Sequence, residues 1–502
     1  MRDSLSTGGS KDSSLSAPAS GDITPVVGSV TLKEKICYAL GDVGNALAVS
    51  SVSFWLLIYL TDVAGLAPAQ AAIAMMLGRC WDAVCDPVVG WITDHTNSRW
   101  GKRRPFLFFF AIPYAVFYAA LWMVPEFESS NARFIYVATA LVLFNTCFAF
   151  VLVPYASLTA SITNDYKERI SLTGFRMIAS QSSFLVGAAL PSWFVAWAVS
   201  PSGRDYFTRH GLNETFGSWA GTEHQGFLLM GLGFGMIMIV SIWTVFAGIR
   251  ERVTEKTGNH HAPGSPFSYT FLILRELRMS RPFRIAVGIL CLSEFAGALV
   301  AVNIPYFIKY VVLLEGIQTK ILCALFLCAI FAMPFWIRLA RLRGKAETYR
   351  VVMIVYALIL CTLSLVGVGN SFGVLAVAAC GGLCHAAALM IPWSMIPDLV
   401  EYDEFHNGER REGLFYGGAL FCYKLATAMA VMFSGFVLSI VGYAAEAAQS
   451  DLVVHSMRLM IGPAPAIVLL LAAWLASRHP LTAEKHRELV AALAQKRNRS
   501  AA

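Results

Sequence analysis

The sequence predicts an all-α membrane protein built from twelve transmembrane helices. Of its 502 residues, 57% are hydrophobic and only 14% are charged, whereas about 25% of the residues in soluble domains are charged. The mean hydropathy of +0.59 exceeds what soluble cores can hold. Apolar segments recur at the length of about 20 residues that a helix needs to cross a bilayer, and none has the alternation typical of membrane β-strands.

The expected helices follow one another through most of the chain. In lipid a helix is favoured because it satisfies its backbone hydrogen bonds internally. We expect helices at residues 35–60, 68–92, 105–124, 133–157, 171–198, 225–248, 284–312, 318–339, 350–369, 372–396, 413–442 and 453–477.

Basic residues gather in alternate connections between these helices. They occupy 99–104 and 338–350, and seven lie within 250–284, whereas 62–70 and 442–455 contain no Lys or Arg. By the positive-inside rule both termini are cytosolic, and the expected location is a bacterial inner membrane. The net charge of +7 resides in these loops rather than in a basic groove, so no nucleic-acid partner is expected.

The longest cytosolic connection divides the chain into halves. The sequence WITD…RWGK at 91–102 has a weak counterpart, WIRLARLRGK, at the same place in the second half, 336–345. Two six-helix halves with such a repeat favour the major facilitator fold. The expected organisation is a disordered cytosolic tail (1–31), a first half (32–249), a cytosolic linker (250–283), a second half (284–478) and a second tail (479–502).

The second helix carries the densest group of intramembrane charges. Asp82 and Asp86 are spaced i, i+4 and share one helix face, and Arg79 lies one turn before Asp82. An ionisable residue inside the bilayer costs about 2.5–3.5 kcal/mol on insertion scales. Adjacent carboxylates repel each other unless a monovalent cation binds or one is protonated. We therefore predict that Asp82 and Asp86 bind a coupling cation; the alternative is an Arg79–Asp82 ion pair with Asp86 beside a kink at Pro87.

Other charged residues interrupt the apolar segments. Arg176 and Lys424 are expected to balance the acids or to meet an anionic group of a substrate in a central cavity, although Arg176 lies near a helix end from which it can reach the interface. Glu294 and Asp42 are further candidates.

The loop after the second helix is dense in charge. Asp94, Arg99, Lys102, Arg103 and Arg104 lie close together in sequence. We interpret them as a cytosolic gate whose charges hold one conformational state and separate in the other. The same residues also serve as topogenic charge.

Several motifs resemble those of one transporter family, over about residues 33–485. They are YLTDVAGL at 59–66, RCWDAVCDP at 79–87, WGKRRP at 100–105, PYASL at 154–158, PWSMIPDLVEYD at 392–403 and GERREG at 408–413. They resemble the glycoside–pentoside–hexuronide:cation symporter family of the major facilitator superfamily, which is melibiose permease-like and also similar to the animal sodium-dependent lysophosphatidylcholine symporter.

The resemblance implies a role for four charged residues. Asp82 and Asp86 match the family's cation-binding acids, and Arg176 and Lys424 match basic residues around its cavity. The sugar-binding acids of melibiose permease, in contrast, fall at Ala46 and Leu152.

These departures change the expected cargo and leave the coupling ion open. A cation-site threonine falls at Ala149, so sodium and proton both remain possible. We expect Asn45, Tyr155 and Trp393 to lie in the substrate cavity with Arg79 and Glu294. An apolar cavity with basic residues suits a lysophospholipid-like amphipathic or anionic solute, although a glycoside remains open.

The expected function is cation-coupled uptake of an organic solute by alternating access. The expected partners are a small-molecule or lysolipid substrate and membrane lipid. No cofactor is expected besides sodium or a proton as the coupling ion, and the protein is expected to be a monomer. The alternative is a non-transporting membrane receptor or scaffold with the same fold. A channel lacks a filter segment, and an enzyme is not expected because no Ser-His-Asp or Cys-His set converges in one region.

Overall fold

The computed structural model of the chain is helical throughout the part that it describes. That part comprises residues 30–96, 98–163, 166–210, 217–252, 280–314, 316–407, 412–445, 447–481 and short pieces beyond 483. The expected N-terminal tail, most of the 250–283 linker and much of the C-terminal tail lie outside the described residues.

Among the residues that the structure describes, the first half contains six long helices and one short one. The long helices are α1 (Leu32–Ile58, continued by the π-helical turn η1, Tyr59–Val63), α2 (Pro68–His95), α3 (Arg104–Leu121), α4 (Ser130–Ile162), α5 (Tyr166–Val199) and α8 (Glu223–Gly248). The connection between α5 and α8 also contains α6 (Pro201–Arg209) and the 3-10 turn η2 (Gly217–Trp219).

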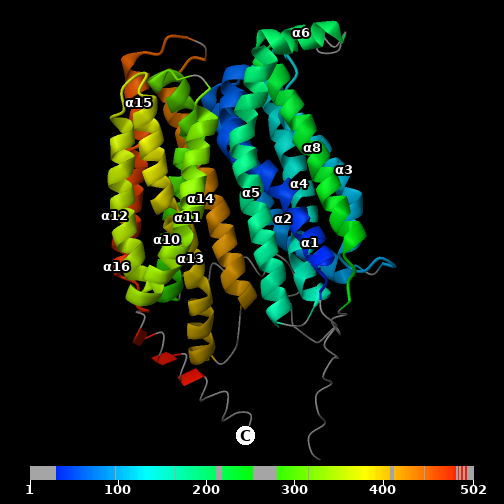
Figure 1. The fold of residues 1–502 in the computed structure, drawn as a ribbon, viewed down its shortest axis with the longest axis vertical. Helices are drawn as coiled ribbons and strands as arrows, with labels where there is room; N and C mark the ends of the chain where they lie inside the picture. The colour runs from blue at the N-terminus through cyan, green and yellow to red at the C-terminus, as the bar shows by residue number, and fades with distance from the viewer. Residues whose placement is uncertain are drawn as a thin grey trace, which may run out of the picture.

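The second half repeats the arrangement of six spans. They are α10 (Arg281–Tyr306, continued by η3, Phe307–Val312), α11 (Gln318–Arg343), α12 (Lys345–Ser364), α13 (Ser371–Asn407), α14 (Glu412–Ile440) and the pair α15 (Asp451–Ile461) and α16 (Pro463–Ser477). The last span is broken at Gly462 and Pro463, because proline begins a helix well but cannot continue one. Figure 1 shows the two halves side by side.

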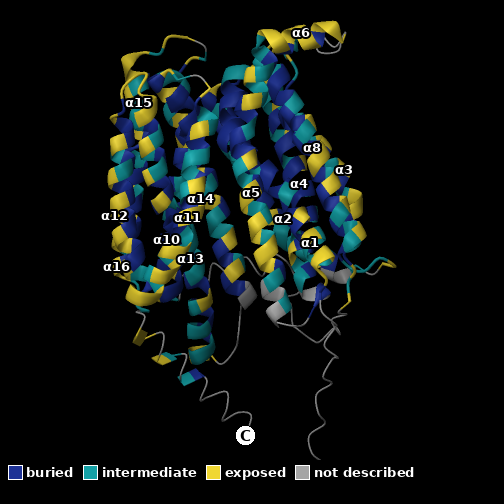
Figure 2. Ribbon diagram, viewed as in Figure 1, coloured by how far each residue is buried: buried dark blue, intermediate teal, exposed yellow. Residues whose placement is uncertain are grey.

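The described helices confirm the all-α membrane fold. Eleven spans are long and apolar enough to cross a bilayer. The remaining long helix, the 28-residue α2, makes twelve; it is less apolar because Arg79, Asp82 and Asp86 interrupt it. The outward sides of α3, α8, α12 and α16 carry exposed residues (Figure 2), among them Phe109, which is 61% exposed, and Leu358, which is 64% exposed. Such apolar surfaces are stable against lipid rather than water.

Two features differ from the expected boundaries. The helix expected at 372–396 continues through Pro392 and Pro397 to Asn407, so it extends past the apolar run. The loop after the fifth span contains α6, whose N-cap Ser200 accepts a hydrogen bond from the Gly203 N–H at 3.1 Å. A helical turn with its own cap is not visible in hydropathy, which reports only the apolar runs.

The halves approach each other closely at the end that carries α6 and η3. A Cβ built on Gly435 of α14 would lie 2.6 Å from the backbone oxygen of Pro68, the first residue of α2. Only glycine permits this approach. We refer to this end as the outer end, and to the other, where the 99–104 and 338–345 residues lie, as the basic end.

Candidate functional site

The acid pair of α2 faces a lysine from the other half of the protein. Lys424 Nζ of α14 donates a hydrogen bond to Asp86 Oδ2 at 2.6 Å and lies 2.8 Å from Asp82 Oδ2. The i, i+4 spacing places both carboxylates on one face of α2, and α14 packs along α2. One ammonium group therefore bridges two acids and connects the two halves.

The charges of this cluster do not balance. The Asp82 side chain is 0% exposed, that of Lys424 8% and that of Asp86 28%. Asp82 Oδ1 and Asp86 Oδ1 have no hydrogen-bond donor among the described residues. Two carboxylates against one ammonium leave one negative charge in a buried place, where an uncompensated charge is costly. A monovalent cation or a proton would remove it.

A backbone oxygen lies next to the same acids. Pro87 stands inside α2 and has no N–H, so the carbonyl oxygen of Ala83, four residues earlier, lacks its helical donor. Ala83 lies between Asp82 and Asp86 in sequence. The turn thus offers two carboxylates and one carbonyl that lacks its usual helical donor, and such oxygen atoms are ligands that hard cations prefer. Ala149, where the family's threonine falls, instead packs against Cys85 and Val89.

Arg79 does not pair with Asp82. No carboxylate among the described residues lies within ion-pair distance of its guanidinium group; Arg79 lines a large cavity instead. The alternative interpretation of the α2 charges as an Arg79–Asp82 ion pair therefore differs from the arrangement found, in which Lys424 is the partner.

Arg176 of α5 has a separate partner. Its Nε lies 3.1 Å from Asp42 Oδ2, and its Cζ lies 4.9 Å from the centre of the Tyr155 ring. The Tyr155 hydroxyl donates to the backbone oxygen of Tyr38 at 2.7 Å. Arg176 and Tyr155 thus belong to a cluster of first-half residues, in which Asp42 rather than Asp82 or Asp86 is the ion-pair partner of Arg176.

The large cavity lies between the two halves and holds about 480 Å³, within the range of small-molecule sites. Its apolar wall comes from both halves and includes Val49, Phe54, Met75, Phe144, Phe184, Phe326, Ile330, Met333 and Leu389. Its charged lining residues are Arg79 from the first half and Glu294 from the second. Trp393 also lines it and donates from Nε1 to Glu294 Oε1 at 3.4 Å.

The predicted cavity residues separate into two groups. Arg79, Glu294 and Trp393 line the cavity, whereas Asn45, Tyr155 and Arg176 are not among its lining residues. Asn45 is 3% exposed and donates to the Gly41 oxygen in its own helix at 3.3 Å.

The acid cluster lies behind the cavity wall. Asp82, Asp86 and Lys424 do not line the cavity, but Arg79 of α2 and Tyr423 of α14 do. Arg79 and Tyr423 are helix neighbours of the cluster, so the acids are one side-chain layer away from any bound solute.

The predicted gate residues are held largely within the first half. The Glu251 carboxylate accepts hydrogen bonds from the backbone N–H groups of Lys102, Arg103 and Arg104, at 3.0, 2.9 and 3.2 Å. It thus caps the N-terminus of α3, where an anion is favoured. Gly101, with φ of +105°, lets the loop turn around this carboxylate. Sequence reasoning missed Glu251, which lies about 150 residues away.

The other gate residues contribute less to this arrangement. Arg103 donates to the Ser157 oxygen at 2.8 Å, which ties the loop to α4. Arg99 stacks on Trp100, 5.0 Å from the ring centre. Asp94 lies in the last turn of α2, and its side chain falls outside the described part of the structure.

A cluster at the outer end was also missed by sequence reasoning. The Asp62 carboxylate of η1 is 1% exposed and lies 2.8 Å from Lys309 Nζ of η3. It accepts hydrogen bonds from the hydroxyls of Tyr310, at 2.5 Å, and Tyr443. Thr61 shares a hydrogen bond with the Tyr306 hydroxyl at 2.7 Å. We call this set the outer clasp, because it joins the first half to the second.

The clasp retains its donors across the physiological pH range. Burial and the neighbouring Asp62 carboxylate raise the pKa of Tyr443, so its hydroxyl stays protonated and continues to donate. Thr61 and Asp62 belong to the YLTDVAGL motif. The partners of Asp62 could not be recognised from the sequence because they lie about 250 to 380 residues away.

Comparison with known proteins places this geometry among transporters. The family model described as MFS/sugar transport protein matches residues 37–483. The chain is 28% identical to the mouse sodium-dependent lysophosphatidylcholine symporter 1, over 91% of this chain and 87% of that one. It is 28% identical to the glucuronide carrier protein homolog of Escherichia coli (strain K12), over 90% and 93% of the two chains.

A solved structure shares the fold. A bacterial homolog of the human lysosomal transporter Spinster superposes with a TM-score of 0.65 at 14% identity, covering 89% of this chain and 96% of that one.

Lys424→Met should destabilise the protein, because it leaves the buried carboxylate of Asp82 and the partly buried carboxylate of Asp86 without a counter-charge. Removing one partner of a buried ion pair costs about 3–5 kcal/mol. Thermal unfolding of the purified protein in detergent measures the loss. Adding Asp82→Asn to Lys424→Met should restore part of the stability; a double variant no more stable than the single one would show that Lys424 does not neutralise the acids.

Asp62→Asn should loosen the outer end, because it removes the charge that Lys309 and the two tyrosines meet. Cysteines placed at Ser192 and Thr319, whose hydroxyls lie 2.5 Å apart across the halves, report closure by cross-linking. Cross-linking should fall several-fold in Asp62→Asn and stay unchanged in the exposed-acid control Asp205→Asn. Equal cross-linking in both variants would contradict the role of the clasp.

Proposed function

Because the chain belongs to the MFS/sugar transport protein family, we propose that it is a cation-coupled symporter for an amphipathic, anionic organic solute. The observation that carries this proposal is the bridge from Lys424 to Asp82 and Asp86. It links a site suited to a cation with the contact between the two halves. The protein works by alternating access, with the solute held in the central cavity.

The coupling cation competes with Lys424 for the acid pair. A sodium ion takes the carboxylate oxygens of Asp82 and Asp86 and the carbonyl of Ala83, or a proton neutralises one acid. In either case the ammonium group of Lys424 is attracted less strongly to α2. The contact between α2 and α14 weakens, so cation binding changes the balance between conformations. The buried charge excess supports this cycle.

The cavity chemistry supports an amphiphile with an anionic group. Its aromatic and aliphatic walls suit a hydrocarbon chain, and Arg79 has no acid partner among the described residues. A guanidinium group in a desolvated cavity binds phosphate or carboxylate strongly. On the opposite wall, Glu294 can accept hydrogen bonds from the remaining polar groups of the solute, and the Trp393 N–H can donate to them. The similarity to the mouse lysophosphatidylcholine symporter supports a lysophospholipid-like solute.

A glycoside is the second candidate. Asn145, Gln181 and Thr427 also line the cavity, and their side chains can hydrogen-bond to hydroxyl groups. The name of the Escherichia coli relative supports this alternative.

The proposed orientation places the basic end in the cytosol of a bacterium, with the protein in the inner membrane and both termini inside. The outer clasp then closes the external side. Its buried Asp62–Lys309 pair supports a conformation in which the solute exchanges with the cytosolic side.

The coupling hypothesis predicts uptake driven by an ion gradient. In proteoliposomes, an inward sodium or proton gradient should increase the initial rate of solute uptake, and the gradient that does so identifies the ion. Asp86→Asn should abolish this stimulation, because it halves the charge that binds the cation. Asp205→Asn, in the exposed α6, should keep it. Gradient-independent uptake by the unmodified protein would exclude coupling.

The substrate hypothesis predicts that Arg79 selects the anionic group. Arg79→Gln should raise the KM for a lysophospholipid about 10- to 100-fold, as expected when a hydrogen bond to a charged group worth about 1.5–3 kcal/mol is lost. The KM for a neutral amphiphile with the same acyl chain should stay within twofold. Arg338→Gln, at the exposed basic end of α11, is the matched control.

Two results would count against this assignment. Equal losses for charged and neutral amphiphiles would remove Arg79 from recognition of the anion. Binding of a glycoside in preference to every lysophospholipid would favour the second candidate.

A further inference from the structure

A second cavity lies on the outward side of the second half, near its basic end. It holds about 180 Å³ and shares no lining residue with the central cavity. Its walls come from the end of α11, the beginning of α12 and one residue of α13. The lining residues are Phe335, Trp336, Leu339, Arg343, Glu347, Thr348, Val351, Val352, Val355 and Cys384.

The deeper part of this groove is apolar and faces the bilayer. Phe335 is 58% exposed, Val351 48% and Val355 44%. From Arg343 to Phe335 the helix rises over eight residues, or about 12 Å at 1.5 Å per residue. In a membrane protein such a surface meets hydrocarbon rather than water. An acyl chain is therefore the occupant that fits the deeper part.

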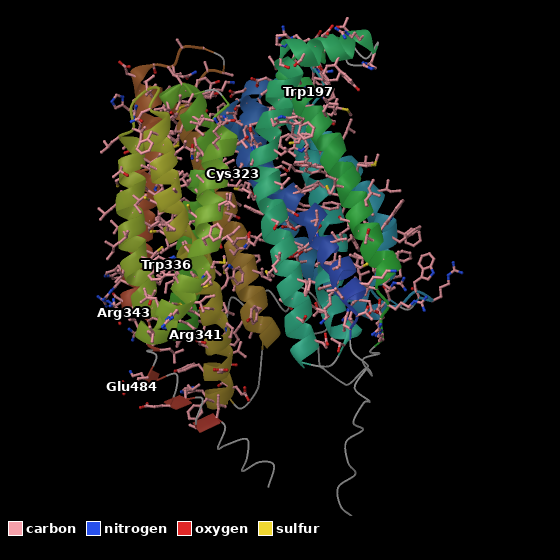
Figure 3. All side chains as sticks on the ribbon, in the orientation of Figure 1. Trp197, Cys323, Trp336, Arg341, Arg343 and Glu484 are labelled. Carbon is pink, nitrogen blue, oxygen red and sulfur yellow. The ribbon has the colours of Figure 1, made fainter. Side chains whose placement is uncertain are left out.

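The mouth of the groove carries one positive and one negative side chain. Arg343 ends α11 and Glu347 lies in the first turn of α12, on either side of Gly344, whose φ of +93° permits the tight connection. Both side chains are exposed, and no ion pair joins them. Figure 3 shows Arg343 beside Arg341 at this end, with Trp336 deeper in the helix.

The neighbouring lysine is engaged elsewhere. Lys345 lies 2.8 Å from Asp398 Oδ2 and donates to the Ser394 oxygen at 2.7 Å. Arg343 is therefore the basic side chain that lines the mouth. Below the mouth, the hydroxyl of the buried Thr348 has no hydrogen-bond partner among the described residues, so the floor of the groove also has a polar group.

We propose that this groove binds a phospholipid with a primary ammonium group, of the phosphatidylethanolamine type. Arg343 binds the phosphate, Glu347 accepts hydrogen bonds from the ammonium group, and the apolar walls hold one acyl chain. Basic pockets between helices at the cytosolic side bind lipid head groups in other membrane proteins. The negative charge of Glu347 beside Arg343 favours a zwitterionic head group over an anionic one. Because Glu347 accepts hydrogen bonds from N–H groups, it also disfavours a quaternary ammonium group, which has none.

The bound lipid braces a helix of the transport cavity. One side of α11 forms the groove through Phe335 and Leu339, and its inner side lines the central cavity through Phe326 and Ile330. A lipid in the groove therefore supports α11 from outside without touching the solute.

Native mass spectrometry of the full-length protein in detergent tests this site. The probes are dioleoyl phosphatidylethanolamine, phosphatidylcholine and phosphatidylglycerol, titrated separately. We expect one phosphatidylethanolamine to bind at least about tenfold more tightly than either other lipid, a difference of about 1.4 kcal/mol.

Three variants separate the parts of the site, and the first two each have a matched control. Val355→Trp fills the groove and should remove tight binding, whereas Ile354→Trp, the adjacent exposed residue outside the groove, should not. Arg343→Gln should weaken all three lipids, whereas Arg350→Gln should have no effect. Glu347→Gln should remove the preference for phosphatidylethanolamine and leave phosphatidylcholine binding unchanged.

The proposal is overturned by either of two results. One is a preference for phosphatidylglycerol in the unmodified protein, which would indicate a purely anionic head group. The other is a phosphatidylethanolamine preference that survives Glu347→Gln or Val355→Trp. Neither outcome depends on what the protein transports.

Discussion

One ammonium group lies between two carboxylates, of which Asp82 is fully buried and Asp86 is partly buried, and this contact joins the two halves. Lys424 belongs to the second half, and Asp82 and Asp86 belong to the first. A hydrophobic contact at this place would hold the halves together in the same way in every ionic condition. An ion pair that is one positive charge short instead makes the contact sensitive to a cation, because the acids attract any small cation that reaches them. Under the proposed function, this sensitivity is the coupling.

The remaining contacts differ between the two ends of the molecule. At the outer end, the Asp62 clasp crosses between the halves, and Gly435 allows α14 to touch the start of α2. At the basic end, Glu251 caps α3 within the first half, and Lys345 meets Asp398 within the second. The basic-end contacts thus stiffen each half as a unit, whereas the outer contacts hold the halves together. Two rigid halves joined by contacts that can separate suit a rocking movement.

The candidate site was predicted in part, and the limit follows from the range of each interaction. The acid pair was visible because i, i+4 neighbours share a helix face whatever surrounds the helix. Arg79 was also visible as an intramembrane charge, but its place in the cavity lining was not, since neighbouring residues on a helix can point into different surroundings. Arg176 was assigned to the cavity by resemblance, yet it pairs with Asp42. Asn45 and Tyr155 were also expected in the central cavity, but neither residue lines it.

The sequence by itself determined the membrane-spanning helices, the two halves and the pair of acids. These follow from local properties: the length of apolar runs, the charge of short loops and the periodicity of one helix. Only the tertiary structure shows that Lys424 is the basic side chain that contacts the two acids. It also places Arg79 in the lining of the central cavity, and it supplies Asp62 with hydrogen-bond donors from the second half. Lys424 and Asp86 are 338 residues apart, so no local pattern relates them. Helix packing brings them together, because a buried charge is stable only where the fold supplies its partner.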